Sequence, residues 1–134
     1  MKLSTKGRYG LKAMYFLGKL NNGEIISLKQ LSAQTDVTMP YLEKLLGILK
    51  KNNLVEAIRG TNGGYKLSKK SNEITIGEIL RALEGNMYLA DCNSGKCNRS
   101  DCPNYSIFNY IHKKINSVFD ELTLEQMIKG ENYE

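Results

Sequence analysis

The three cysteines of this 134-residue chain lie within one short stretch, DCNSGKCNRSDC. Cys92, Cys97 and Cys102 have four residues between each neighbouring pair, and there is no other cysteine. Thiolates are the usual ligands of iron–sulfur clusters, they also bind zinc, and they are the reactive form in redox switches. The C-x4-C-x4-C spacing differs from the CxxC pairs typical of zinc sites. Four interpretations remain from the residues alone: an iron–sulfur cluster, a zinc site, redox-active thiols or no site.

The cysteines belong to an irregular segment, residues 86–103, which two predicted helices enclose. The helix before it begins with a capping box, because Thr75 is followed three residues later by Glu78, and it ends at Gly85. Its inward side is predicted to carry Ile76, Ile79, Leu80 and Leu83. The position of the segment between two helices indicates that binding of a metal there would act on both of them.

A long helix is predicted after Pro103, and its apolar residues recur at spacings of three and four. This spacing is typical of a coiled-coil-like seam, formed by Phe108, Ile111, Ile115, Val118 and Leu122. We expect the helix to bury the seam against a second copy of the chain, giving a homodimer, rather than to fold back on its own domain. A short capped helix, TLEQMIKG, follows and ends at Gly130.

Charge divides the chain into two unlike halves, although the net charge is only +5. Residues 1–70 contain 13 Lys or Arg against 4 Asp or Glu, whereas residues 71–134 contain 6 against 10. A basic half is a candidate nucleic-acid footprint, because neutralised phosphates supply most non-specific affinity. A merely solvated basic surface is the alternative.

Three helices are predicted in the basic half. The first runs from a cap at Ser4 to about Leu20, the second opens with a Ser27–Gln30 capping box, and the third follows a cap at Thr38. Pro40 fits the first turn of the third helix. Their inward positions are expected to be Leu11, Met14, Tyr15, Leu17 and Leu20, then Leu28, Leu31 and Ala33, then Leu42, Leu45, Leu46 and Leu49. Two short helices joined by a tight turn match a helix-turn-helix.

The stretch NLVEAIRGTNGGYKLS predicts a β-hairpin directly after the third helix. Gly60, Gly63 and Gly64 are expected to supply the positive φ angles of its turn. A hairpin in this place is a wing, so we predict a mainly α fold with a small β-hairpin. The predicted organisation is a winged helix-turn-helix over residues 1–85, a cysteine-containing loop over 86–103, and a dimerisation helix with a short C-terminal helix over 104–134.

A helix-turn-helix directs the start of its second helix at base edges in the major groove. There Glu43 can accept from the amino group of cytosine, and Lys44 can bind a phosphate or guanine. Arg59 on the wing could enter a minor groove. A solvated charge is the strong alternative for Glu43. The candidate contacts to a double-stranded DNA operator are Thr5, Lys6, Arg8, Tyr9, Met39, Pro40, Tyr41, Glu43, Lys44, Arg59, Gly60 and Thr61.

Other function classes have little support in the sequence. A phosphate loop, an HExxH motif and a Ser/His/Asp arrangement are missing and there is one histidine, so we expect neither an enzyme nor a small-molecule substrate. No apolar run approaches 18 residues, and the start MKLSTKGRYG lacks an apolar core, so we expect a cytoplasmic protein without a membrane partner. A cluster carrier or protein-interaction module using the winged helix for protein contacts is a further alternative.

Four stretches, LSTKGRYGLKAM, YLEKLLGILKKNNLV, IRGTNGGYKL and ITIGEILRALEG, together resemble the Rrf2 family of bacterial winged-helix transcription regulators. The resemblance covers nearly the whole chain in order. It implies a homodimer that binds an operator of two related half-sites. It also implies that Tyr41, Glu43 and Lys44 lie on the recognition helix, and that Arg59 with Gly60 starts the wing.

Within that family the chain is most similar to the iron–sulfur regulators, in which three cysteines of the same loop hold a cluster. This implies that Cys92, Cys97 and Cys102 are ligands of an iron–sulfur cluster, with 2Fe–2S favoured and 4Fe–4S possible. Tyr105 stands where some members have a histidine ligand, and Arg8 where others have an acidic one. The fourth ligand is therefore open, with His112, Asp91, Asp101, Asn104 and Tyr105 as candidates beside an exogenous thiol or water.

The resemblance also implies a biological role. It suggests a repressor whose operator binding responds to the cluster and which controls genes of iron–sulfur cluster biogenesis or sulfur metabolism. The alternatives are a regulator in which the cysteines form a zinc site or a thiol redox switch, and a cysteine-metabolism regulator without a cluster.

Overall fold

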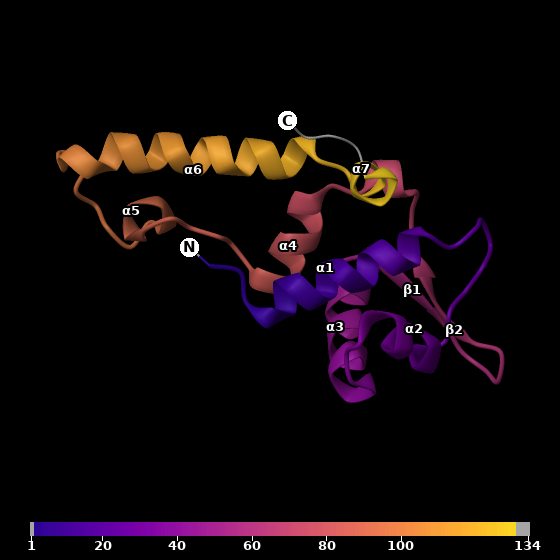
Figure 1. Ribbon diagram of the computed structural model, residues 1–134. Coiled ribbons are helices and arrows are strands. Elements are labelled where there is room, and N and C mark those ends of the chain that lie inside the picture. Colours follow the sequence, from indigo (N-terminus) through magenta and orange to yellow (C-terminus); the bar gives the residue numbers. More distant parts are fainter. Residues whose placement is uncertain (1, 131–134) are drawn as a thin grey trace.

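The computed structural model describes residues 2–130, and it is mostly helical with one two-stranded antiparallel sheet (Figure 1). The elements in chain order are α1 (Thr5–Gly18), α2 (Leu28–Thr35), α3 (Met39–Lys51), β1 (Val55–Ile58), β2 (Gly64–Leu67), η1 (Ser71–Glu73), α4 (Ile76–Glu84), α5 (Asp91–Ser94), α6 (Pro103–Glu121) and α7 (Leu124–Lys129). The winged helix-turn-helix order predicted from the sequence is present. The segment expected to be irregular contains one short helix, α5.

Capping boxes set the start of three helices. The Ser27 hydroxyl accepts from the Gln30 amide, and the same reciprocal arrangement opens α4 at Thr75 and α7 at Thr123. The predictions for Ser27 and Thr75 are therefore confirmed. The predicted side-chain caps at Ser4 and Thr38 are wrong, because neither side chain makes a capping hydrogen bond. The Ser4 hydroxyl instead donates to a carboxylate of α4, over 2.6 Å.

The hairpin pairs Val55 with Leu67 at one end and Ile58 with Gly64 at the other. Gly60 has the expected positive φ, at 113°. The expectation is wrong for Gly63 and Gly64, which have no positive φ. A Cβ on Gly63 would collide with the Ile58 carbonyl, and one on Gly64 with the backbone of Ile26. Glycine is thus required at these two positions because neighbouring backbone lies too close for a Cβ, and not because φ is positive.

The core joins α1 to the helix-turn-helix. Its fully enclosed side chains include Ala13, Met14, Leu31, Leu42, Leu45, Leu46, Leu49, Ile74, Ile79 and Leu124, each 0% exposed. The four leucines predicted for α3 are all among them. Ala33 was expected inside but is exposed, because α2 is only two turns long and buries Leu31 and Thr35 instead.

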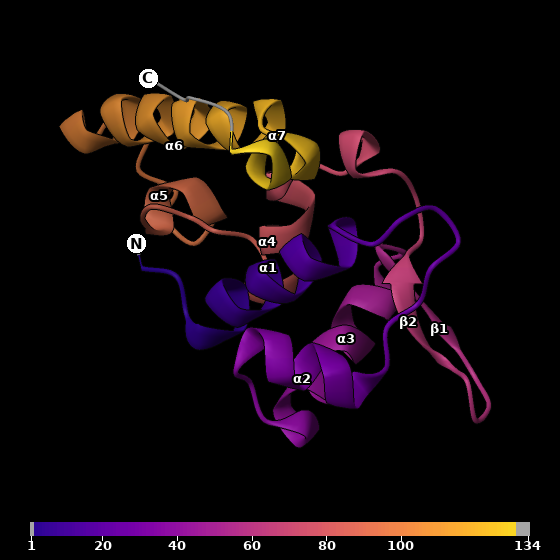
Figure 2. The same ribbon diagram turned by 45° about the vertical axis from the view of Figure 1, so that its right-hand side comes forward.

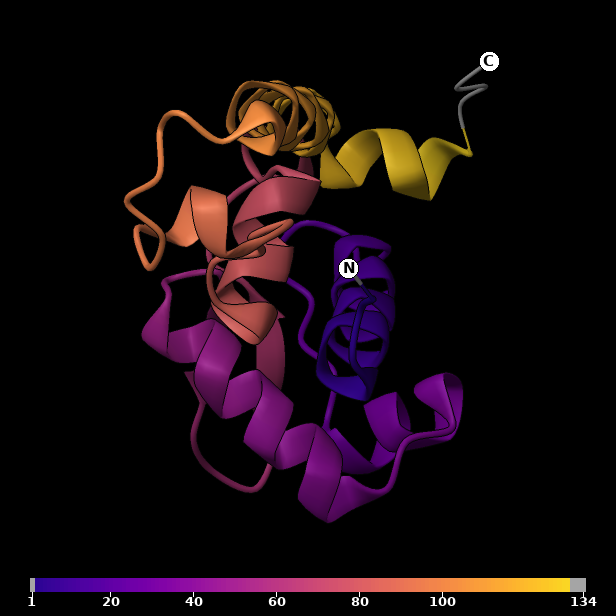
Figure 3. The same cartoon turned by 90° about the vertical axis from the view of Figure 1, so that its left-hand side faces the viewer.

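The helices form successive layers (Figures 1 and 3). α6 lies along one edge, α4 connects it to α1, and α2 with α3 occupies the opposite end. The hairpin extends toward the end that holds α2 and α3 (Figure 2). α7 returns to α1 and η1, where the Leu124 amide donates to the Ile74 carbonyl over 2.9 Å. Within residues 2–130, the helices are all too short or too polar to cross a membrane.

Candidate nucleic-acid interface and cysteine segment

The turn between α2 and α3 is held by local hydrogen bonds. Asp36 ends α2 in the left-handed conformation, with φ of 60°, and the Ser32 hydroxyl donates to the Val37 carbonyl over 2.5 Å. Thr35, 0% exposed, donates its hydroxyl to the Leu31 carbonyl over 2.7 Å. This fixes the direction in which α3 leaves the turn. A helix so fixed can present the same side chains to a ligand without rearrangement.

The outer side of α3 carries four of the twelve residues predicted to contact DNA. Met39, Pro40, Glu43 and Lys44 are exposed, because the buried leucines occupy the other side. The start of α3 is therefore a polar, accessible surface with a rigid apolar support. Its dimensions as a single exposed helix suit the major groove of B-DNA.

Tyr41 connects this surface to α1. Its hydroxyl lies 3.0 Å from Oγ1 of Thr5, and its ring meets the Tyr9 ring edge to face, with centroids 6.2 Å apart. The structure therefore gathers three predicted contact residues, from α1 and α3, into one cluster. Lys6 is half-buried and Arg8 exposed in the same first turns of α1, which adds positive charge there.

The wing carries its predicted contact residues at the turn of the hairpin. Arg59, Gly60 and Thr61 are all exposed. Tyr65, on the returning strand, is half-buried; burial and the negative charge of Glu43 both raise the pKa of its phenol. Tyr65 therefore stays neutral over the physiological range.

Sequence reasoning missed Glu84, the last residue of α4. Its Oε1 accepts hydrogen bonds from the Ser4 amide at 2.8 Å, the Ser4 hydroxyl at 2.6 Å and the Gly7 amide at 3.0 Å. Burial by itself would raise the pKa of this carboxyl, but the hydrogen bonds and the charge of Lys6 outweigh it and lower the pKa. No local sequence signal connects residues about 80 positions apart.

The cysteines occupy three different settings. Cys92 lies in α5, Cys97 in the loop after it, and Cys102 at the N-cap of α6. All three are free thiols and half-buried. In the part of the chain that the structure describes, no three His, Cys, Asp or Glu side chains form a group able to hold a metal ion. The donors fit an iron–sulfur cluster by chemical type, and the segment has to close before they share one centre.

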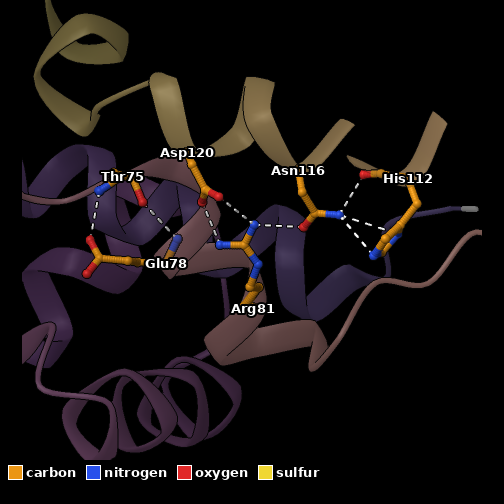
Figure 4. Close-up of polar contacts among 6 residues, drawn as sticks. All are labelled: Thr75, Glu78, Arg81, His112, Asn116 and Asp120. Atoms are coloured by element: carbon orange, nitrogen blue, oxygen red, sulfur yellow. Dashed lines mark hydrogen bonds and ion pairs between the residues drawn. The ribbon is translucent and has the colours of Figure 1, made fainter. Parts of the chain in front are cut away.

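Two contacts attach the cysteine segment to α6. The Asn93 amide donates to Oδ1 of Asn109 over 2.6 Å, and the Tyr88 ring stacks on His112 with centroids 5.5 Å apart. Asn116 contacts the His112 ring and donates to its carbonyl over 2.8 Å (Figure 4). His112, the only histidine of the sequence, therefore has a packing role in this arrangement. Of the other candidate fourth ligands, Tyr105 is half-buried, while Asp91, Asp101 and Asn104 are exposed.

The outer face of α6 is open and carries large apolar side chains, with Nζ of Lys114 lying 5.5 Å from the centroid of the Tyr110 ring. Ile107, Tyr110 and Val118 are 50%, 59% and 52% exposed. The other members of the predicted seam, Phe108, Ile111, Ile115 and Leu122, are half-buried. Along the whole of α6, which lies within the described residues, no side chain is fully buried. A helix of this length with large exposed apolar side chains is a typical protein-interaction surface.

Comparison with known proteins identifies the class of this molecule. Residues 3–130 match the Rrf2 family, described as iron-dependent transcriptional regulators, and the chain belongs to that family. The structure is similar to CymR, the global cysteine regulator of B. subtilis, with a TM-score of 0.84 and 33% identity over 98% of this chain and 99% of that one.

Two IscR proteins are also similar. T. potens IscR gives a TM-score of 0.78 with 34% identity, covering 97% of this chain and 88% of that one. IscR of Cereibacter sphaeroides is 44% identical over 86 residues, which is 63% of this chain and 56% of that protein. The predicted family and winged-helix fold class are thereby confirmed. The chain is an IscR-like DNA-binding transcription regulator and not an enzyme.

Proposed function

We propose that this chain is a homodimeric repressor whose binding to a two-half-site operator responds to an iron–sulfur cluster held by Cys92, Cys97 and Cys102. One observation carries the proposal: all three cysteines lie in the segment that joins α4, which packs on α1, to the outer helix α6. A change in that segment acts on both the DNA-binding helices and the open face of α6. The regulated genes, on this proposal, serve iron–sulfur cluster biogenesis or sulfur metabolism.

The DNA contacts divide into positioning and base-reading groups. Thr5, Lys6, Arg8 and Tyr9 lie at the start of α1 and would bind phosphates, which sets register without reading sequence. Glu43 and Lys44 project from the exposed side of α3 and would read base edges. The remaining proposed contacts are Met39, Pro40 and Tyr41 on α3 and Arg59, Gly60 and Thr61 on the wing.

Dimerisation would bring two copies of α3 and of the wing to one operator. The exposed Ile107, Tyr110 and Val118 of α6 would pack against the same residues of a second copy, since a two-fold interface is formed by one patch on both subunits. The spacing of the two α3 helices would then match the spacing of the operator half-sites.

The cysteine segment would close to hold the cluster. When bound, an iron–sulfur cluster supplies a centre that responds to iron supply and oxidants. The half-buried thiols of Cys92, Cys97 and Cys102 can bind it only as thiolates, and residues 86–102 have to rearrange to bring them together. Because Asn93 and Tyr88 contact α6, that rearrangement would also move or release α6.

Anaerobic purification tests the cluster directly. We expect visible charge-transfer absorption with matched iron and acid-labile sulfide, and operator affinity that differs between loaded and chelator-stripped protein. The triple variant Cys92→Ala/Cys97→Ala/Cys102→Ala should lose the colour and keep the fold. A colourless, iron-free parent after reconstitution would contradict the cluster. Bound zinc or a reversible thiol oxidation would then support the alternative of a zinc site or redox switch.

DNA binding has its own test. We expect salt-dependent, sequence-specific binding of a duplex recovered by the parent protein from a random-sequence pool, weakened by Arg59→Ala. Lys51→Ala, which removes an exposed charge at the end of α3, is the matched control. Equal binding by both variants would contradict the wing contact.

A further inference from the structure

Two charged side chains of α4 bind two different helices. Arg81 binds Asp120 and Asn116 of α6, and Glu84, one turn further on, binds the start of α1. The cysteine segment begins directly after Glu84 and Gly85. α4 therefore joins the outer helix to the DNA-binding layer, and its last residue lies at the junction with the cysteines.

Glu84 performs the capping role that Ser4 leaves unfilled. The first amides of a helix have no intrahelical acceptor, and the positive end of the helix dipole favours a carboxylate. Here Oε1 of Glu84 accepts from the Gly7 amide as well as from both donors of Ser4. A side chain at position 7 would collide with that carboxylate, so the contact requires Gly7.

The capped turn of α1 continues into the recognition helix. Thr5 follows Ser4, and its Oγ1 lies 3.0 Å from the hydroxyl of Tyr41 on α3. Tyr9, one turn along α1, supports the Tyr41 ring from the side. Glu84, Ser4, Thr5 and Tyr41 thus form a continuous series of hydrogen bonds and one peptide link. It runs from the end of α4, two residues before the cysteine segment, to the DNA-binding surface.

We propose that Glu84 is a positioning residue for DNA binding: it fixes the first turn of α1, and through Thr5 the orientation of Tyr41, and it couples the cysteine segment to the recognition helix. The DNA part of this inference rests on the proposed function, while the orientation of Tyr41 does not. Coupling between two sites is reciprocal, so DNA binding must in turn change the cysteine segment.

The first test follows Tyr41 itself. Ring-proton resonances of Tyr41 are measured by NMR in the parent, Glu84→Ala, Glu84→Gln and the control Glu73→Gln, which alters an exposed carboxylate on η1. We expect a shift in Glu84→Ala, partial recovery in Glu84→Gln because its amide oxygen still accepts, and no shift in the control. Thr5→Val should shift the Tyr41 resonances as well, and this can be measured even if Glu84→Ala does not fold. Unmoved Tyr41 resonances in folded Glu84→Ala, with only a lower melting temperature, would overturn the proposal.

The second test measures affinity for the duplex recovered by the parent. Glu84→Ala should bind about tenfold more weakly, consistent with loss of charge-assisted hydrogen bonds, with Glu84→Gln between it and the parent. Parent-like affinity of Glu84→Ala would overturn the positioning role. If the parent itself recovers no duplex, the proposed function fails, and the Tyr41 resonances still decide whether Glu84 orients that ring.

The third test measures coupling in cluster-free protein. Iodoacetamide alkylation of the three cysteines is timed with and without the duplex. We expect DNA to change the rate in the parent and in Glu73→Gln, and to leave it unchanged in Glu84→Ala. An equal DNA effect in parent and Glu84→Ala, or no effect in the parent, would overturn the coupling.

Discussion

Arg81 of α4 and Asp120 of α6 form a two-pronged ion pair. Nη1 donates to Oδ1 over 2.6 Å and Nη2 donates to Oδ2 over 3.2 Å, while Nη2 also donates to Asn116 over 2.7 Å (Figure 4). The planar guanidinium fits this geometry and a lysine does not. It attaches α6 to α4, which in turn packs on α1.

Replacement of Arg81 should loosen that attachment. We expect Arg81→Ala to lower the free energy of unfolding by about 1 kcal/mol, because Asp120 is half exposed and solvent screens the pair. Arg81→Lys should recover less than half of the loss. Urea unfolding at low and high salt measures both. Glu56→Gln, which removes a looser 3.7 Å pair with Lys66, is the control. An equal loss in control and Arg81→Ala would contradict this ranking.

The capping threonines differ in a way that stability measurements can detect. Thr75 accepts from the Glu78 amide at 3.0 Å, whereas the side chain of Thr38 makes no capping bond. Thr75→Ala should therefore cost about 1 kcal/mol of unfolding free energy. Thr38→Ala should cost much less. Thermal and urea unfolding of both variants checks the difference, and a larger loss at Thr38 would show that its hydroxyl has another role.

Two helical glycines should respond oppositely to alanine. A Cβ at Gly10 would collide with the side chain of Leu83, which is only 5% exposed, so Gly10→Ala should destabilise by about 1–3 kcal/mol. A Cβ at Gly47 on α3 meets nothing within 4 Å. Gly47→Ala should stabilise by about 0.5–1 kcal/mol through helix propensity. Equal melting temperatures for the two variants would contradict the close approach of α1 and α4.

Acidification should remove the contribution of the Glu84 carboxylate to the free energy of unfolding. Burial alone would raise the pKa of this carboxyl, but the hydrogen bonds from Ser4 and Gly7 and the charge of Lys6 lower it overall. A carboxyl whose pKa is lower in the folded than in the unfolded protein stabilises the fold at pH values above the unfolded-state pKa. That stabilisation is lost as the pH falls through the folded-state pKa. The stability difference between parent and Glu84→Gln should therefore be constant near neutral pH and shrink in acid. A stability difference that grows on acidification would contradict the lowered pKa of Glu84.

The open face of α6 should determine association. Val118→Asp places a charge in the apolar patch and should lower the dimer content in sedimentation velocity, because burying an unpaired charge in an interface is costly. Asn72→Asp adds the same charge at an exposed position on η1, away from α6, and serves as the control. A parent that sediments as a monomer, or a Val118→Asp variant that dimerises like the parent, would contradict the proposed interface.

Local signals predicted much of the fold. The Ser27–Gln30 and Thr75–Glu78 spacings located two helix starts, and the leucines of α3 located its buried side, because each depends on neighbours a few residues apart. The errors have physical causes as well. Gly63 and Gly64 were predicted from the need for positive φ angles, whereas they are required because the backbone of Ile58 and Ile26 lies close to them.

The contacts that connect the layers were not predictable in the same way. Ser4 has the sequence of an N-cap, but the oxygen that satisfies the start of α1 comes from Glu84, which only the packing of α4 on α1 brings near. The three cysteines were recognised by type and spacing. Their separation among α5, a loop and the start of α6 depends on tertiary contacts such as Tyr88 with His112.

The position of Leu124 has a consequence for how a cell makes this protein. It is fully enclosed in the same core as Met14 and Ile74 and is among the last described residues of the chain. Because ribosomes deliver the N-terminus first, that core stays unfinished until the cysteine segment and α6 have both been translated. A nascent chain interrupted before α7 would expose apolar surface and be degraded by proteases. A shortened chain that keeps the winged helix-turn-helix and lacks the cysteines would therefore also lack this part of its core.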